Sequence, residues 1–166
     1  EYTVLWERIS FGSTMAPNML EASTYDVIKE IEGIVGCLPS SSEGLVDAKE
    51  LDRKRLARVL LYPSERGMDY VMSGPAIPSK MLFQRFVDDL FFGGGTMVEA
   101  RQCKEFVSYI FQGHGLYTDP AKDLVASDDC DSRTGEVKSG HVLGYLLALE
   151  RDDLHCAFSG TMPQDK

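Results

Sequence analysis

Apolar residues recur along the chain at two different spacings, which together predict a protein of mixed helices and strands. Residues 2–11 are rich in β-branched and aromatic side chains, as is typical of a strand. Pro17 suits the first turn of a helix, and Gly36 is a plausible end for it. Between them, apolar residues recur at helical spacing at Leu20, Val27, Ile28, Ile31, Ile34 and Val35.

Residues 46–80 show a helical pattern of apolar residues first and a loop-like composition after it. Residues 46–62 predict a second amphipathic helix that Pro63 ends. Its apolar face comprises Leu51, Leu56, Val59 and Leu60. Residues 63–80 contain three prolines and two glycines, so we predict a loop-rich connection there.

A hairpin and a further helix are predicted in the second half of the chain. Two apolar runs, 81–87 and 90–92, flank Asp88 and Asp89, which predicts a tight β-hairpin with two carboxylates at its tip. After three glycines, Thr96 and Glu99 have capping-box spacing and open a helix over residues 97–111. The side chains expected to face inward are Val98, Cys103, Phe106, Val107, Ile110 and Phe111.

The C-terminal part favours short strands. We predict them at residues 116–118, 135–138, 141–148 and 154–158, with a turn at 151–153. His114, between two glycines after the predicted helix, is expected to be an exposed loop residue.

Composition narrows the class of protein. The chain has 166 residues, of which 43% are hydrophobic, which suits one domain with a sizeable core. No apolar run is long enough for a membrane span, and no secretory signal is evident. The chain begins at Glu1 without methionine, so we expect a processed chain or an excised piece.

The charge balance weighs against a nucleic-acid-binding protein, and the cysteine spacing weighs against a structural zinc site or a disulfide framework. The net charge of −9, from 17 basic and 26 acidic residues, weighs against a free-standing nucleic-acid-binding protein. The four cysteines are widely spaced and form no CxxC motif. We therefore expect reduced, mostly buried thiols and an intracellular location, cytoplasmic or nuclear, with no membrane partner.

The paired aspartates are the sharpest chemical feature. Carboxylates inside an apolar hairpin are costly unless they have a partner or a metal ion. Asp88 and Asp89 side by side would suit Mg²⁺, which prefers oxygen ligands. The alternative is a solvent-exposed Asp-Asp turn without a metal.

Four segments in order resemble the palm of reverse transcriptases, and cover most of residues 1–158. FVDDLFFGGGT at 86–96 is similar to the aromatic-x-Asp-Asp hairpin, and 8–20 is similar to the segment with the PFG and AP motifs. GLYTDPAK at 115–122 resembles the segment G-L-x-x-N-P-x-K, and VLGY at 142–145 resembles the primer grip. The tail VLGYLLALERDDLHC is similar to the ending of Bel/Pao-type retrotransposon polymerases.

This resemblance implies RNA-directed DNA polymerase chemistry. Asp88 and Asp89 would be the catalytic residues and Mg²⁺ ligands. A primer 3′-hydroxyl would attack an α-phosphate with the help of two metal ions.

The resemblance also implies substrate-binding residues, which would surround the metal ions. Phe11 and Gly12 would lie by the incoming nucleotide and the template, and Lys122 near the nucleotide phosphates. Gly144 and Tyr145 would hold the primer end.

Departures from the family pattern place the activity in doubt. The first metal-binding aspartate and the fingers region of the family have no counterpart in this chain. Ser10 replaces the proline of PFG, Asp119 replaces an asparagine, and Phe86 stands where many relatives have tyrosine. The resemblance therefore covers the C-terminal part of the palm.

Two functional hypotheses follow from the resemblance. The chain is either an inactive palm fragment that serves as a protein-interaction module, or a module of an active polymerase whose first aspartate lies outside it. The first hypothesis implies a protein partner or a second copy of the chain. The second implies an RNA or DNA primer–template, bound only within a complete polymerase.

A third hypothesis comes from residues 43–51, which imitate the second half of an EF-hand loop. Gly44, Val46 and Glu50 match positions 6, 8 and 12, whereas Pro39 and Ser41 are poor Ca²⁺ ligands. A degenerate EF-hand light-chain-like binding protein would be all-helical.

The fold class that we expect is α+β, an antiparallel sheet with helices on one face, as in an incomplete polymerase palm. We expect a single partial domain over 1–166. Its parts are a strand plus helix (1–36), a variable helical and loop insert (37–80), the Asp-Asp hairpin with helix and strands (81–158) and a tail (159–166).

Overall fold

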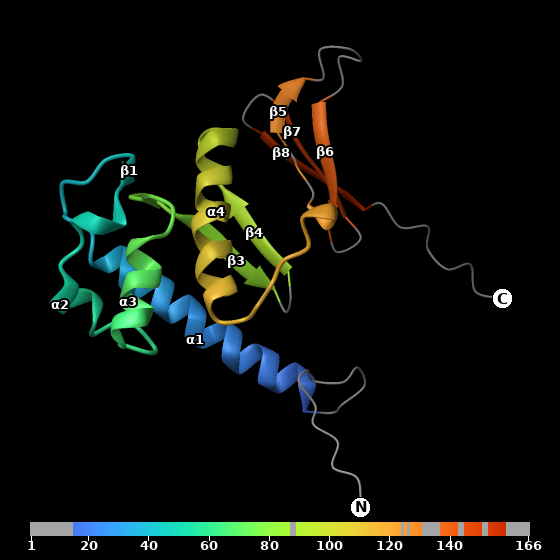
Figure 1. Ribbon diagram of the computed structural model, residues 1–166. Coiled ribbons are helices and arrows are strands. Elements are labelled where there is room, and N and C mark those ends of the chain that lie inside the picture. Colours follow the sequence, from blue (N-terminus) through green and yellow to red (C-terminus); the bar gives the residue numbers. More distant parts are fainter. Residues whose placement is uncertain are drawn as a thin grey trace, which may run out of the picture. The chain divides into compact units, whose positions relative to one another are not determined.

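A computed structural model describes the chain over residues 15–86, 89–123, 125, 127–130, 137–142, 145–150 and 153–158 (Figure 1). The chain divides into two compact units, Glu1–Tyr117 and Thr118–Lys166. Each unit is described by itself. The strand predicted at residues 2–11 lies outside the described residues.

The first long helix, α1, spans Ala16–Gly36 and confirms the helical pattern read from the sequence. Pro17 lies in its first turn, where a missing backbone N–H costs nothing. Val27, Ile31 and Ile34 are buried, because their spacing places them on one face of the helix. Side chains from Asn18 to Ser23, including Leu20, are exposed.

The helix predicted over 46–62 is wrong, because the segment breaks into three short elements. These are strand β1 (Leu45–Val46), 3₁₀ helix η1 (Ala48–Glu50) and one turn of helix, α2 (Arg53–Leu56). The side chains of Asp47 and Asp52 accept hydrogen bonds from the backbone N–H groups of Lys49 and Lys54. Such local bonds start a new turn each time and compete with one continuous helix.

The apolar positions in this segment were nevertheless predicted correctly. Leu51, Leu56 and Leu60 are buried, and Val59 packs partly buried against the same core. Burial thus follows the hydrophobic pattern, although the backbone does not.

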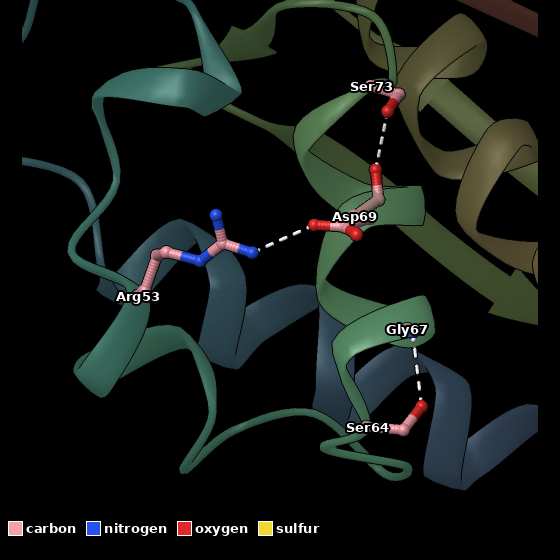
Figure 2. Close-up of polar contacts among 5 residues, drawn as sticks. All are labelled: Arg53, Ser64, Gly67, Asp69 and Ser73. Carbon is pink, nitrogen blue, oxygen red and sulfur yellow. Dashed lines mark hydrogen bonds and ion pairs between the residues drawn. The ribbon is translucent and has the colours of Figure 1, made fainter.

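The loop predicted over 63–80 contains a helix, α3 (Glu65–Met72), so this prediction is also wrong. The Ser64 hydroxyl accepts a hydrogen bond from the N–H of Gly67 and caps the helix (Figure 2). Arg53 of α2 bonds Asp69 of α3 at 2.8 Å, and the Ser73 hydroxyl donates to the Asp69 carbonyl. Beyond α3, strand β2 (Ile77–Pro78) pairs antiparallel with β1.

The predicted hairpin and the capped helix after it are confirmed. Strands β3 (Leu82–Phe86) and β4 (Asp89–Gly93) pair antiparallel. Helix α4 (Met97–Gly113) begins with the reciprocal Thr96–Glu99 capping box. Val98 is 62% exposed, so its predicted inward position is wrong, because it lies in the first turn and off the buried stripe. The other predicted inward residues are buried: Cys103, Phe106, Val107, Ile110 and Phe111.

Helix α4 is the centre of this N-terminal unit. It contacts α1, β2 and both strands of the β3–β4 hairpin (Figure 1). Ile31 and Ile34 of α1 join Phe106 and Ile110 of α4 in one core cluster. Burial of these large apolar side chains is the main source of stability for the unit.

Two tyrosines tie α3 to α4. The rings of Tyr70 and Tyr109 stack with centroids 4.4 Å apart and planes 13° from parallel. Each hydroxyl donates a 2.8 Å hydrogen bond to the backbone carbonyl of the other residue. Gly113 and Gly74 leave room for the rings, since an added Cβ would lie 2.5 Å from Tyr70 and Tyr109, respectively.

The C-terminal unit contains 3₁₀ helix η2 (Pro120–Lys122) and a four-stranded antiparallel sheet. Its strands are β5 (Ser127–Cys130), β6 (Val137–Val142), β7 (Tyr145–Glu150) and β8 (Asp153–Phe158), in that order across the sheet.

One strand prediction is wrong, one is confirmed in part and one is confirmed. Residues 116–118 form no strand. The single strand predicted at 141–148 is two antiparallel strands, with Val142 paired to Tyr145. Leu143 and Gly144, between the two strands, lie outside the described residues. The strand predicted at 154–158 is confirmed as β8, while Arg151 and Asp152 of the predicted turn lie outside the described residues.

The fold class is α+β, as predicted. The β1–β2 and β3–β4 pairs are two small antiparallel sheets that pack with helix α4. The described strands form three separate sheets, and this mixture differs from the all-helical structure that the EF-hand hypothesis requires. Among the described helices, none combines the length and the hydropathy needed to cross a membrane.

Candidate metal-binding hairpin

The register of the β3–β4 hairpin places Asp89 at its tip. Phe86 pairs directly with Asp89, so Val87 and Asp88 are the two residues that connect the strands. Both lie outside the described residues. Asp89 is exposed.

The two faces of the hairpin differ in their surroundings. Phe83, Leu90 and Phe92 pack partly buried against the core, and the thiol of Cys103 contacts the carbonyl of Leu82 at 3.7 Å. The opposite face exposes Leu82 and Phe86, which are 68% and 55% accessible. One face thus anchors the hairpin to α4, while the tip with Asp89 projects beyond the buried contacts.

A basic side chain lies one register position from the tip. Arg85 pairs across the hairpin with Leu90, next to Phe86–Asp89. Its guanidinium lies 3.5 Å from Glu21 of α1, and the Arg85 side chain is only 17% exposed. Glu21 therefore offsets part of the positive charge that Arg85 places against the hairpin.

The donor set of the tip suits Mg²⁺ by type but is incomplete. Adjacent aspartates supply the hard oxygen ligands that this ion prefers. Within the parts of the chain that the structure describes, no three His, Cys, Asp or Glu side chains gather as a metal-binding group. Binding of Mg²⁺ by Asp88 and Asp89 therefore stays a prediction from the sequence.

The other predicted site residues are distributed over both units. Lys122 is exposed in η2, and Tyr145 begins β7, paired with Val142 and Phe158. Both belong to the C-terminal unit, whereas Asp89 belongs to the N-terminal unit. Three further predicted residues, Phe11, Gly12 and Gly144, lie outside the described residues.

The described thiols agree with the expectation of buried, unpaired cysteines. Cys37 and Cys103 are free and buried. Burial raises the pKa of both thiols; the nearby Arg55 partly offsets this for Cys37, and a backbone hydrogen bond to Leu82 does so for Cys103. Neither thiol is placed as a reactive nucleophile.

Sequence reasoning missed a contact between a buried glutamate and a histidine. Glu30 of α1 is 5% exposed, and its Oε2 lies 3.0 Å from Nε2 of His114. The backbone N–H of Leu61 donates to the same oxygen at 3.1 Å. The expectation that His114 is exposed is wrong, because its side chain is only 17% accessible in this contact.

One signal for this pair was present in the sequence. Glu30 is three residues after Val27 and four before Ile34, which places a carboxylate inside the apolar stripe of α1. A buried carboxylate requires polar partners; the N–H of Leu61 donates a hydrogen bond to it, and Nε2 of His114 lies within 3.0 Å.

Comparisons with protein families, curated proteins and solved structures found no match to this chain.

Proposed function

We propose that the chain is a reverse-transcriptase-like palm fragment, derived from a retroelement polymerase, which by itself is inactive and acts as a protein-interaction module. The observation that carries this proposal is the β3–β4 hairpin, whose register pairs Asp89 with Phe86 next to the connection between the strands. The motif order over residues 8–145 supports the same family.

The inactivity of the isolated chain is argued from its ligands and its charge. Two carboxylates at one tip leave the metal site short of the third carboxylate that the family supplies. The net charge of −9 opposes a nucleic acid, whose affinity comes largely from phosphate neutralisation by basic residues. Lys122 lies next to Asp119 and Asp123 in sequence, which reduces the local positive charge.

A partner protein or a second copy is expected because apolar side chains remain exposed on the hairpin and on α1. Leu82 and Phe86 on the outer face of β3 and Met15 and Met19 at the start of α1 are each about half exposed or more. Large apolar side chains in such a group are typical of an interaction surface.

The first test is a Mn²⁺ titration followed by paramagnetic broadening of backbone amide signals. We expect weak binding that broadens residues 82–93, and loss of this effect in an Asp88→Ala/Asp89→Ala variant. Asp26→Ala, which removes an exposed carboxylate from α1, is the matched control and should leave the broadening unchanged. Equal broadening in the wild-type chain and the double variant would mean an ordinary exposed turn.

The second test separates the inactive fragment from a polymerase module. We expect no extension of a primer by the isolated chain with Mg²⁺ and deoxynucleotides, and negligible binding of an RNA–DNA hybrid at physiological salt. Extension that Asp88→Ala abolishes would show an active polymerase module instead.

A further inference from the structure

A cavity of about 300 Å³ lies within the N-terminal unit, next to the buried pair of Glu30 and His114. Its volume is at the lower end of the range for small-molecule sites. Residues of α1, α3, α4 and the segment 60–64 line it, so four separate parts of the chain define its shape. The cavity is distinct from the β3–β4 hairpin, none of whose residues lines it.

The cavity is lined by apolar side chains and by aromatic rings. Leu60, Val71 and Ile110 are each at most 7% exposed and form the apolar part. Tyr62 and Tyr70 add aromatic rings. Aromatic faces attract cations because the ring quadrupole is negative above the plane.

The carboxylate of Glu30 is the decisive polar group. The backbone N–H of Leu61 donates to Oε2 of this carboxylate, and Nε2 of His114 lies 3.0 Å from the same oxygen. Oε1 accepts no hydrogen bond from a described residue. A carboxylate side chain that is only 5% exposed gains most from a donor that also carries positive charge.

We propose that the cavity binds a small organic cation, an ammonium or guanidinium group on a short apolar body. The charged group would donate to Oε1 of Glu30, and the apolar body would contact Leu60, Val71 and Ile110. An anion is disfavoured because it would approach the same carboxylate. Arg66 is exposed and is the one arginine among the described residues that line the cavity. An anion in the cavity would have to pair with its guanidinium group.

The test uses three probes of one shape: benzylammonium, benzyl alcohol and benzoate. Binding is followed by chemical shifts of the amide signals of Leu61 and Gly113 in a two-dimensional NMR spectrum. We expect benzylammonium to bind in the millimolar range and benzyl alcohol to bind about tenfold more weakly, since the neutral probe lacks the charge-assisted hydrogen bond. This comparison needs no variant, so it holds even if a substitution perturbs folding.

Variants then assign the binding to Glu30. Glu30→Gln keeps the side-chain length and an oxygen acceptor for Leu61 and His114, and we expect it to weaken benzylammonium binding about tenfold. Glu32→Gln removes an exposed carboxylate from the same helix and should leave the affinity unchanged. An acetylated and amidated Ala-Lys-Ala peptide, compared with benzylammonium, tells whether the cavity prefers a free amine or the basic side chain of a peptide.

Three results would overturn the proposal. Equal affinity for the three probes would show a purely apolar cavity. Preferred binding of benzoate, lost in Arg66→Ala, would show an anion site. The absence of shifts with any probe would leave Glu30 as a structural tie between α1, Leu61 and His114.

Discussion

Replacing Gly113 with alanine is expected to destabilise the N-terminal unit, although alanine is the better helix former. Gly113 is the last residue of α4, and a Cβ added there would lie 2.5 Å from Cε1 of Tyr70. The ring cannot move aside easily, because it stacks on Tyr109 at 4.4 Å and its hydroxyl is bonded to the Tyr109 carbonyl. The steric conflict therefore falls on a ring that is held at two points.

The magnitude follows from two opposing contributions. In a helix, Gly→Ala gains about 0.5–1 kcal/mol, because alanine loses less backbone entropy on folding. Overpacking against a fixed neighbour costs about 1–3 kcal/mol. We expect the steric cost to exceed the gain and the free energy of unfolding to fall by about 1–2 kcal/mol.

Gly36 provides a matched control. It is the last residue of α1, and a Cβ added there would meet nothing within 4 Å. Gly36→Ala should therefore stabilise the protein by about 0.5 kcal/mol. Urea unfolding followed by far-ultraviolet circular dichroism measures both variants.

The reasoning is refuted if Gly113→Ala is as stable as the wild-type protein, or more stable. A second background makes the test sharper: in Tyr70→Ala, the ring is gone and Gly113→Ala should no longer destabilise. A loss of the same size in that background would place the cause outside the contact with Tyr70.

Three further outcomes are expected. Thr96→Ala removes the capping box of α4 and should lower the free energy of unfolding by about 1 kcal/mol, measured by urea unfolding, and an unchanged midpoint would argue against the cap. Arg53→Ala breaks the ion pair with Asp69, whose side chains are 55% and 64% exposed, and should cost at most about 1 kcal/mol in the same assay; a larger loss would indicate a role beyond this pair. Burial raises the pKa of Cys37 and Cys103, so their alkylation should be slow at neutral pH and accelerate only at higher pH or in urea, and rapid labelling of the folded protein followed by mass spectrometry would contradict this.

The same thiols link stability to alkaline pH. Their folded-state pKa values lie above those of the unfolded chain, so the unfolded state releases its thiol protons first as pH rises. The stability contributed by the neutral thiols is complete below the unfolded pKa and is lost as pH rises through the folded pKa. Urea midpoints of the wild-type protein and a Cys37→Ala/Cys103→Ala variant, measured at neutral and alkaline pH, test this; an equal change with pH in both proteins would refute it.

The parts of the fold that the sequence predicted correctly depend on local or periodic signals. The stripe of Val27, Ile31 and Ile34 identified α1, and the Thr96–Glu99 pair identified the start of α4. The hairpin followed from two apolar runs around a short polar turn. Each of these signals lies within a few residues of the structure that it specifies.

The features that sequence reasoning missed depend on local side-chain hydrogen bonds that compete with a continuous helix, or on contacts between residues far apart in the sequence. Asp47 and Asp52 divide a segment whose apolar spacing alone suits one helix. Helix α3 lies among prolines and glycines, and its packing depends on Tyr70 meeting Tyr109, 39 residues away. Of the predicted site, Asp89 was placed correctly at the hairpin tip, but the contact of Glu30 with His114 joins two parts of the chain that no local pattern relates.

The order of strands β5–β6–β7–β8 has a consequence for the rate of folding. Each strand pairs with its neighbour in sequence, so the sheet can grow one hairpin at a time, with little loop-closure entropy at each step. The N-terminal core is different, because Ile31 of α1 meets Phe106 of α4 only after most of that unit has been brought together. Since distant contacts slow folding, the docking of α1 onto α4 is expected to set the refolding time of the N-terminal unit, while the C-terminal sheet forms its pairs from nearby residues.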